Sequence, residues 1–154
     1  MIKLKEILSE SNHIHSGDKL YSGRLGNDDK FDDWRPAFFT KNIKDASFFA
    51  TPSVFTKNSG IPMVIEAKVV FKNSCDWDLL ENVGEELKVT DSEVNKYIDT
   101  NNGVVDFLYV PRVLKKLEML GYDSYVDVDV LLDQHISVAV VWHKNQIHIL
   151  NILG

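Results

Sequence analysis

The segment Pro62 to Phe71, PMVIEAKVVF, constrains the fold of this chain more than any other feature. It is rich in β-branched and aromatic residues, which favour an extended strand. We expect further strands at 37–40, where Ala-Phe-Phe-Thr forms a short buried run, and near both 136–142 and 147–152. His143, Lys144 and Asn145 are expected to join these last two strands in a tight hairpin.

Helical patterns separate the expected strands. Asn42 is suited to cap a helix over about 43–50, with Asp45 in its first turn, where the helix dipole favours a negative charge. Pro52 should end that helix. From Lys19 onward the sequence therefore mixes helices and strands, and we expect an α+β domain.

Three more helices are expected in the second half of the chain. The segment DWDLLENVGEEL is polar and helical, and DSEVNKYID follows it with Asp91 or Ser92 as its cap. In VPRVLKKLEMLGYD, Pro111 stands in the first turn and Gly121 just past the end, the asymmetry expected of a helix. A helix C-cap is the simplest interpretation of Gly121.

Composition excludes several classes of protein. The 154 residues are enough for one domain with a buried core, and a net charge of −6 argues against a sequence-independent nucleic-acid binder. The single Cys75 excludes an internal disulfide framework and a multi-cysteine zinc site, and it fits a reducing compartment. No apolar run approaches the roughly 20 residues of a membrane span. We expect a soluble protein with no membrane partner.

Residues 1–18 are expected to stand apart from a domain over 19–154. MIKLKEILSES is an amphipathic helix pattern, and a polar linker follows it. One interpretation is a short first helix docked on the domain. The other is that the segment resembles the removable leader of internal head proteins of large tailed phages, which ends at a Leu-x-Glu cleavage point, here Leu8-Ser9-Glu10.

Most candidate sites of familiar chemistry are incomplete. His13 and His15 have no third ligand nearby for zinc, and His135-Ile136-Ser137 is only one of the two His-x-Ser/Thr copies that a two-histidine phosphodiesterase needs. The acidic loop NDDKFDD lacks the ligand spacing of a calcium loop and is expected to face water. Cys75 has no evident group to lower its pKa, so we interpret it as structural. No metal site is predicted.

A succession of short motifs is more informative. Leu20-Tyr21-Ser22-Gly23 is followed by Phe38-Phe39-Thr40, by a helix with Ala46, Phe48 and Phe49, by Leu120-Gly121-Tyr122-Asp123, and by VAVVW leading into Gln146-Ile147. This order resembles the ADP-ribosyltransferase-like superfamily, especially its small phage and mobile-element members. Those proteins carry a Tyr-His-Gly or Tyr-Arg-Gly start, a Phe-Thr strand with an Ala-x-x-Tyr helix, a Gly-Tyr-Asp-Gly turn and a Gln-Ile pair. The match spans about residues 19–150.

The resemblance implies split antiparallel sheets with flanking helices that grip NAD in a cleft and transfer its ADP-ribose to a host protein. It places the protein in the host cytoplasm, delivered from the virion. Positive charge develops on the ribose as nicotinamide leaves, so a carboxylate is useful nearby. An aromatic wall can stack on the nicotinamide, and a cation or hydrogen-bonding group can hold the ribose or diphosphate.

The resemblance also assigns residues. Its NAD contacts fall on Tyr21, Ser22, Gly23, Phe39, Thr40 and Phe49. Ser22 stands where the family has His or Arg, and Arg24 can supply the missing cation because side chains two apart on a strand share a face. The family's Glu at the start of the last core strand is absent; Asp133 and Gln134 occupy that place. The catalytic candidates are therefore Arg24, Gln134 and Asp133.

Other interpretations remain open. The aromatic residues of these motifs can be simple core, and Arg24 can pair with Asp28 or Asp29 of the acidic loop. On the same fold, the chain is either an active NAD-dependent transferase or a non-enzymatic binding protein, such as a host-factor inhibitor or a packaged virion protein. A third possibility is an unrelated α+β structural protein.

Overall fold

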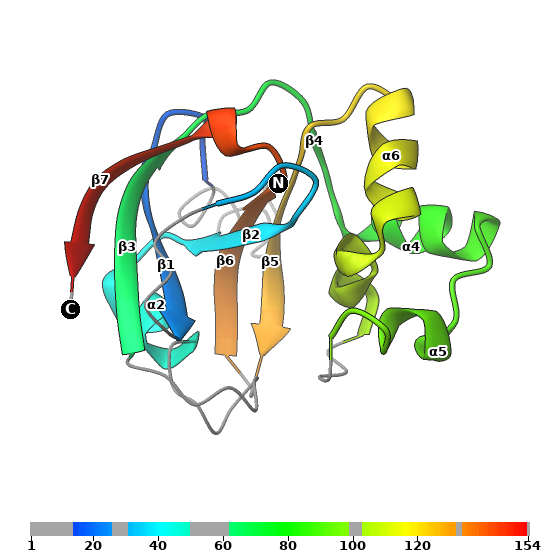
Figure 1. Cartoon of the computed structure of the whole chain (residues 1–154), viewed down its shortest axis with the longest axis horizontal. Helices are drawn as coiled ribbons and strands as arrows, with labels where there is room; N and C mark the ends of the chain where they lie inside the picture. Colours follow the sequence, from blue (N-terminus) through cyan, green and yellow to red (C-terminus); the bar gives the residue numbers. More distant parts are fainter. Residues whose placement is uncertain (1–13, 26–30, 50–61, 99–102, 132–133, 154) are drawn as a thin grey trace, which may run out of the picture.

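The computed structural model describes residues 14–25, 31–49, 62–98, 103–131 and 134–153 (Figure 1). Within these ranges the chain alternates between strands, α-helices and two 3₁₀ helices, which confirms the predicted α+β class. The elements in chain order are β1 (Lys19–Leu25), β2 (Ala37–Thr40), α2 (Ile43–Phe49), β3 (Pro62–Val69), β4 (Ser74–Cys75), α4 (Trp77–Glu86), α5 (Asp91–Val94), η1 (Gly103–Tyr109), α6 (Pro111–Met119), β5 (Ser124–Leu131), β6 (Gln134–Val141), η2 (Lys144–Gln146) and β7 (Ile147–Leu153).

The described strands form one sheet of seven, in the order β4-β5-β6-β2-β1-β3-β7. The short β4 runs parallel to β5, and the other neighbours are antiparallel. β3 lies within the predicted 62–71 strand, and its residues 62–68 pair with β1. Figure 1 shows α4, α5 and α6 gathered beside β5 at one end of the sheet, with β7 at the other.

The predicted hairpin between the last two strands is wrong. β7 pairs with β3, in the register Val69↔Ile147, and three strands separate it from β6. Gln146 explains the change of direction, because its backbone carbonyl accepts a 2.9 Å bond from the Val70 amide and its side-chain amide donates to the carbonyls of Val70 and Asp123. The connection after β6 is thus tied to the end of β3, where β7 starts.

Several elements of the structure were not predicted, among them β5 and η1. β5 has the sequence SYVDVDVL, and its alternation of valine with aspartate is a period-two signal that could have identified it. It pairs with β6 over its full length. The 3₁₀ helix η1 lies before α6, and Val105 and Leu108 are buried within it.

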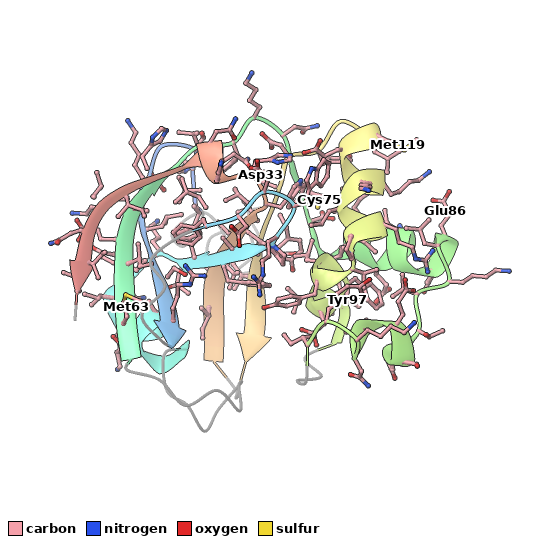
Figure 2. The ribbon with its side chains drawn as sticks, in the orientation of Figure 1. Asp33, Met63, Cys75, Glu86, Tyr97 and Met119 are labelled. Atoms are coloured by element: carbon pink, nitrogen blue, oxygen red, sulfur yellow. The ribbon has the colours of Figure 1, made fainter. Side chains whose placement is uncertain are left out.

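Two hydrophobic clusters lie on opposite faces of the sheet. Val138 and Val140 belong to the cluster under the helices, whereas Ala139 and Val141 belong to the second cluster. This alternation follows from the period of two along a strand. Cys75 is buried in the helical cluster, and Figure 2 places it between the sheet and α6. The structural interpretation of Cys75 is thus confirmed.

The residues that begin and end the helices were mostly predicted. Asn42 caps α2 by accepting a 2.9 Å bond from the Asp45 amide, and Gly121 ends α6 with φ of 94°. The cap of α5 was misplaced: Thr90 accepts the bond from the Glu93 amide, because the helix starts earlier than predicted. Within the described ranges, no helix is both long and apolar enough to cross a membrane.

Candidate functional site

The predicted first-strand residues lie on β1, between β2 and β3. Tyr21 pairs with Thr40 of β2 on one side and with Glu66 of β3 on the other. Ser22 is only 5% exposed, since it lies on the same face as the core residue Leu20. Arg24 follows on that face, at the half-buried end of the strand. The structure therefore keeps Ser22 and Arg24 on one face, as predicted.

The β2 residues are less accessible than an NAD contact requires. Phe39 has no exposed surface and belongs to the second core cluster, which matches the interpretation of this aromatic residue as core. Thr40 is 3% exposed, and its hydroxyl donates to the carbonyl of Asn42 at 3.0 Å. That bond uses the only hydrogen of the hydroxyl, so Thr40 retains only acceptor capacity for a ligand.

Arg24 has an aromatic partner that the sequence analysis missed. Its guanidinium carbon lies 4.6 Å from the centre of the Phe31 ring, within the range of a cation–π contact. Phe31 in turn lies 5.7 Å from Phe39, ring centre to ring centre. The phenylalanine in the acidic stretch KFDD was the sign in the sequence that could have indicated this contact, because phenylalanine is usually buried against other groups.

The remaining site candidates are only partly described. Gln134 is the first residue of β6, and it precedes Val138, which pairs with Thr40, by four positions. The side chains of Gln134 and Phe49 lie outside the described part of the structure, as do Asp133 and the acidic residues Asp28 and Asp29. The leader and its expected cleavage point Leu8-Ser9-Glu10 also lie outside the described residues.

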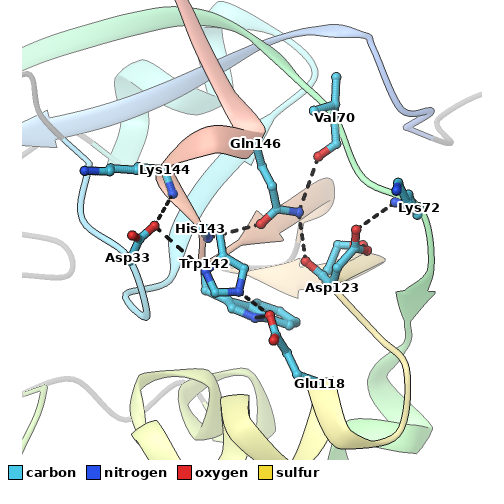
Figure 3. Close-up of polar contacts among 10 residues, drawn as sticks. Asp33, Val70, Lys72, Glu118, Asp123, Trp142, His143, Lys144 and Gln146 are labelled. Carbon is cyan, nitrogen blue, oxygen red and sulfur yellow. Dashed lines mark hydrogen bonds and ion pairs between the residues drawn. The ribbon is translucent and has the colours of Figure 1, made fainter.

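Two motifs of the resemblance meet in space. The side-chain amide of Gln146, from the Gln-Ile pair, donates to the carbonyl of Asp123, from the Gly-Tyr-Asp turn, at 3.0 Å (Figure 3). The Asp123 carboxylate accepts bonds of 2.8 and 3.0 Å from the backbone amides of Lys72 and Asn73. These contacts join the end of β3, the start of β5 and the start of β7, so both motifs hold the sheet together at one end.

A second polar cluster includes residues that the sequence analysis did not select. His143 contacts Glu118 through Nε2, and its Nδ1 lies 3.8 Å from Asp33 Oδ1. The Trp142 indole also donates to Glu118, at 3.0 Å, and the Trp34 ring packs edge-on against His143 at 4.7 Å. Glu118 and His143 are 25 positions apart, and Asp33 is 110 positions before His143, so only the fold brings them together.

Burial alters two other titratable groups. It raises the pKa of the Cys75 thiol to about 12, which leaves the thiol protonated and unsuited to act as a nucleophile. It also raises the pKa of Tyr109, whose ring stacks on Phe38 with centres 5.5 Å apart. Among the described residues, no group of three or more acidic, histidine or cysteine side chains is arranged to hold a metal ion.

The chain matches no protein-family model, and comparisons with curated proteins and with solved structures found no significant match.

Proposed function

We propose that this chain is an ADP-ribosyltransferase-like protein of the phage type, which binds NAD beside β1 and transfers ADP-ribose to a host protein. The observation that carries the proposal is Arg24, which lies on the predicted first strand and packs on Phe31. A guanidinium is suited to a diphosphate because it presents several donors in one plane. The contact between Gln146 and Asp123 supports the proposal, because it joins two motifs of the resemblance.

Residues from the first strand and from the start of the last core strand would share the work of the reaction. Arg24 would hold the diphosphate, while the bond between ribose C1′ and the nicotinamide nitrogen breaks and its electron pair leaves with nicotinamide. A nucleophile of the target would then form the new bond to C1′ and lose its proton. Gln134 can orient the ribose by hydrogen bonds. Asp133 is the acidic residue beside it in the sequence, and its negative charge would stabilise the positive charge that develops on the ribose.

The second candidate is a non-enzymatic binding protein on the same fold. It is favoured by the composition of the central strands, because β1, β2 and β6 contain no aspartate or glutamate. The burial of Ser22 and Phe39 points the same way, since both side chains are withdrawn from a ligand. Such a protein would bind a host factor, or be packaged in the virion, without turning over NAD.

Isothermal titration with NAD, together with labelling from radioactive NAD in a bacterial lysate, separates these candidates. A transferase should bind NAD and label protein, and Arg24→Ala should weaken binding at least tenfold, as expected for loss of a charge-assisted contact. Arg35→Ala is the matched control, because Arg35 is an exposed cation paired only with nearby Asp32 in the described structure. Absence of both binding and labelling would reject the transferase, whereas binding without labelling would favour the non-enzymatic protein.

A further inference from the structure

His143 lies at a junction of three parts of the molecule. It lies two residues past the end of β6, its Nε2 contacts Glu118 of α6, and its Nδ1 faces Asp33 in the segment 31–36 that leads into β2. The side chain of His143 is 24% exposed, and those of Glu118 and Asp33 are 31% and 51% exposed. The histidine is therefore half-buried between two carboxylates from different elements.

The geometry argues against a role for His143 as a general base. A catalytic imidazole needs one nitrogen free to exchange a proton with a substrate. Here each ring nitrogen faces a carboxylate (Figure 3). The Trp34 ring covers the imidazole edge-on. Lys144 contributes a backbone amide that donates to Asp33 at 2.9 Å, and its side chain points away from the ring in Figure 3. No further ion pair reaches the ring within the described residues.

The arrangement instead suits a doubly protonated ring. An imidazolium is a donor at both nitrogens, whereas a neutral imidazole turns one lone pair outward. If Nε2 keeps its hydrogen for Glu118, deprotonation leaves a lone pair at Nδ1 facing the negative charge of Asp33. The attraction between the ring and the 31–36 segment therefore exists when the ring is charged and is lost as pH rises. Histidine ordinarily changes charge between pH 5 and 8.

The 31–36 segment, which this contact holds, contains a residue in an unfavourable backbone conformation. Trp34 has φ of 61°, in the left-handed region that is unfavourable for a bulky side chain. Its amide donates to the carbonyl of Trp142 at 2.6 Å, and its ring packs on His143. Phe31, which lies under Arg24, belongs to the same segment. Loss of the charge contact therefore favours release of a segment that reaches the candidate site.

We propose that His143 is a proton-dependent latch, which in acid fastens the 31–36 segment to α6 and β6 and releases it as pH rises. This inference does not depend on the proposed binding of NAD, since every contact in it lies within the chain.

Amide hydrogen exchange tests the latch on the whole protein. The readouts are the amides of Trp34 and Lys144, which are bonded to Trp142 and Asp33. Protection factors, corrected for the intrinsic effect of pH on exchange, should fall by about two- to fivefold between about pH 5.5 and 8, as expected when one partly exposed ion pair is lost. His143→Gln should abolish this pH dependence. His148→Gln is the control, because His148 is exposed on β7 and lies outside the cluster.

A second variant keeps the test decisive if His143→Gln does not fold. Asp33→Asn removes one of the two carboxylates from an exposed position and leaves the contact with Glu118 in place. It should remove the pH dependence at Trp34 while the fold is retained. Protection that does not change with pH in the natural sequence, or that changes equally in Asp33→Asn, would overturn the latch.

Discussion

Gly84 lies in α4, where that helix packs against η1, and its replacement by alanine sets two effects of opposite sign against each other. Helix propensity alone favours alanine over glycine by about 1 kcal/mol. The structure opposes this gain, because a Cβ at position 84 would lie 2.2 and 2.4 Å from two carbons of the Phe107 ring. Ordinary carbon contacts are about 3.5 Å or longer, so the ring would have to move by roughly 1 Å.

We expect packing to prevail. Phe107 packs against the helical core cluster, and overpacking of this kind costs about 1–3 kcal/mol. After the gain in propensity, Gly84→Ala should destabilise the protein by up to about 2 kcal/mol, and the melting temperature should fall by up to roughly 8 °C. Urea unfolding followed by circular dichroism measures the difference in free energy directly.

Two further variants isolate the cause. Asn82→Ala, at an exposed position of the same helix, gains propensity without a steric clash and should be neutral or slightly stabilising. In a Phe107→Ala background, which removes the whole ring, Gly84→Ala should lose most of its cost, and the double-mutant cycle gives the coupling. A Gly84→Ala protein that is more stable than the natural sequence by the full gain in propensity, about 1 kcal/mol, would refute the packing of α4 on η1 described above.

Three other predictions concern titratable groups. Burial raises the pKa of Cys75 to about 12, so Ellman's reagent should not react with the native protein at about pH 8 but should react fully in concentrated guanidinium chloride. Asp123→Ala leaves the amides of turn 72–73 without their acceptor and should cost about 1–3 kcal/mol in thermal unfolding, with Asp123→Asn intermediate. Arg112 lowers the pKa of Glu93, so this pair stabilises the fold at neutral pH and less as acid protonates the carboxylate. The loss of melting temperature in Arg112→Gln should therefore be small, and smaller still at about pH 3; an equal loss at both pH values would contradict the assignment.

The parts of the fold that were predicted depend on neighbours along the chain. β3 follows from a run of β-branched residues, and the ends of α2 and α6 follow from Asn42 and Gly121. The β6 to β7 connection was mispredicted because a short loop between two strands usually indicates a hairpin. The bonds from Gln146 to Val70 and Asp123 override that local preference.

The candidate site likewise combines features that the sequence predicts with features that depend on packing. The shared face of Ser22 and Arg24 follows from strand periodicity, whereas the burial of Phe39 and the position of Phe31 under Arg24 depend on how β1 and β2 pack. The contacts of His143 with Glu118 and Asp33 join segments that are far apart in the sequence.

By itself, the sequence determined the α+β class, the position of its clearest strand and the caps of α2 and α6, because these depend on backbone preferences and on hydrogen bonds within a few residues. Only the tertiary structure decided the strand order, the place of β7 beside β3 and the pairing of His143 with two carboxylates. The physical reason is that contacts between distant segments depend on how the elements pack, and local sequence preferences do not specify that packing.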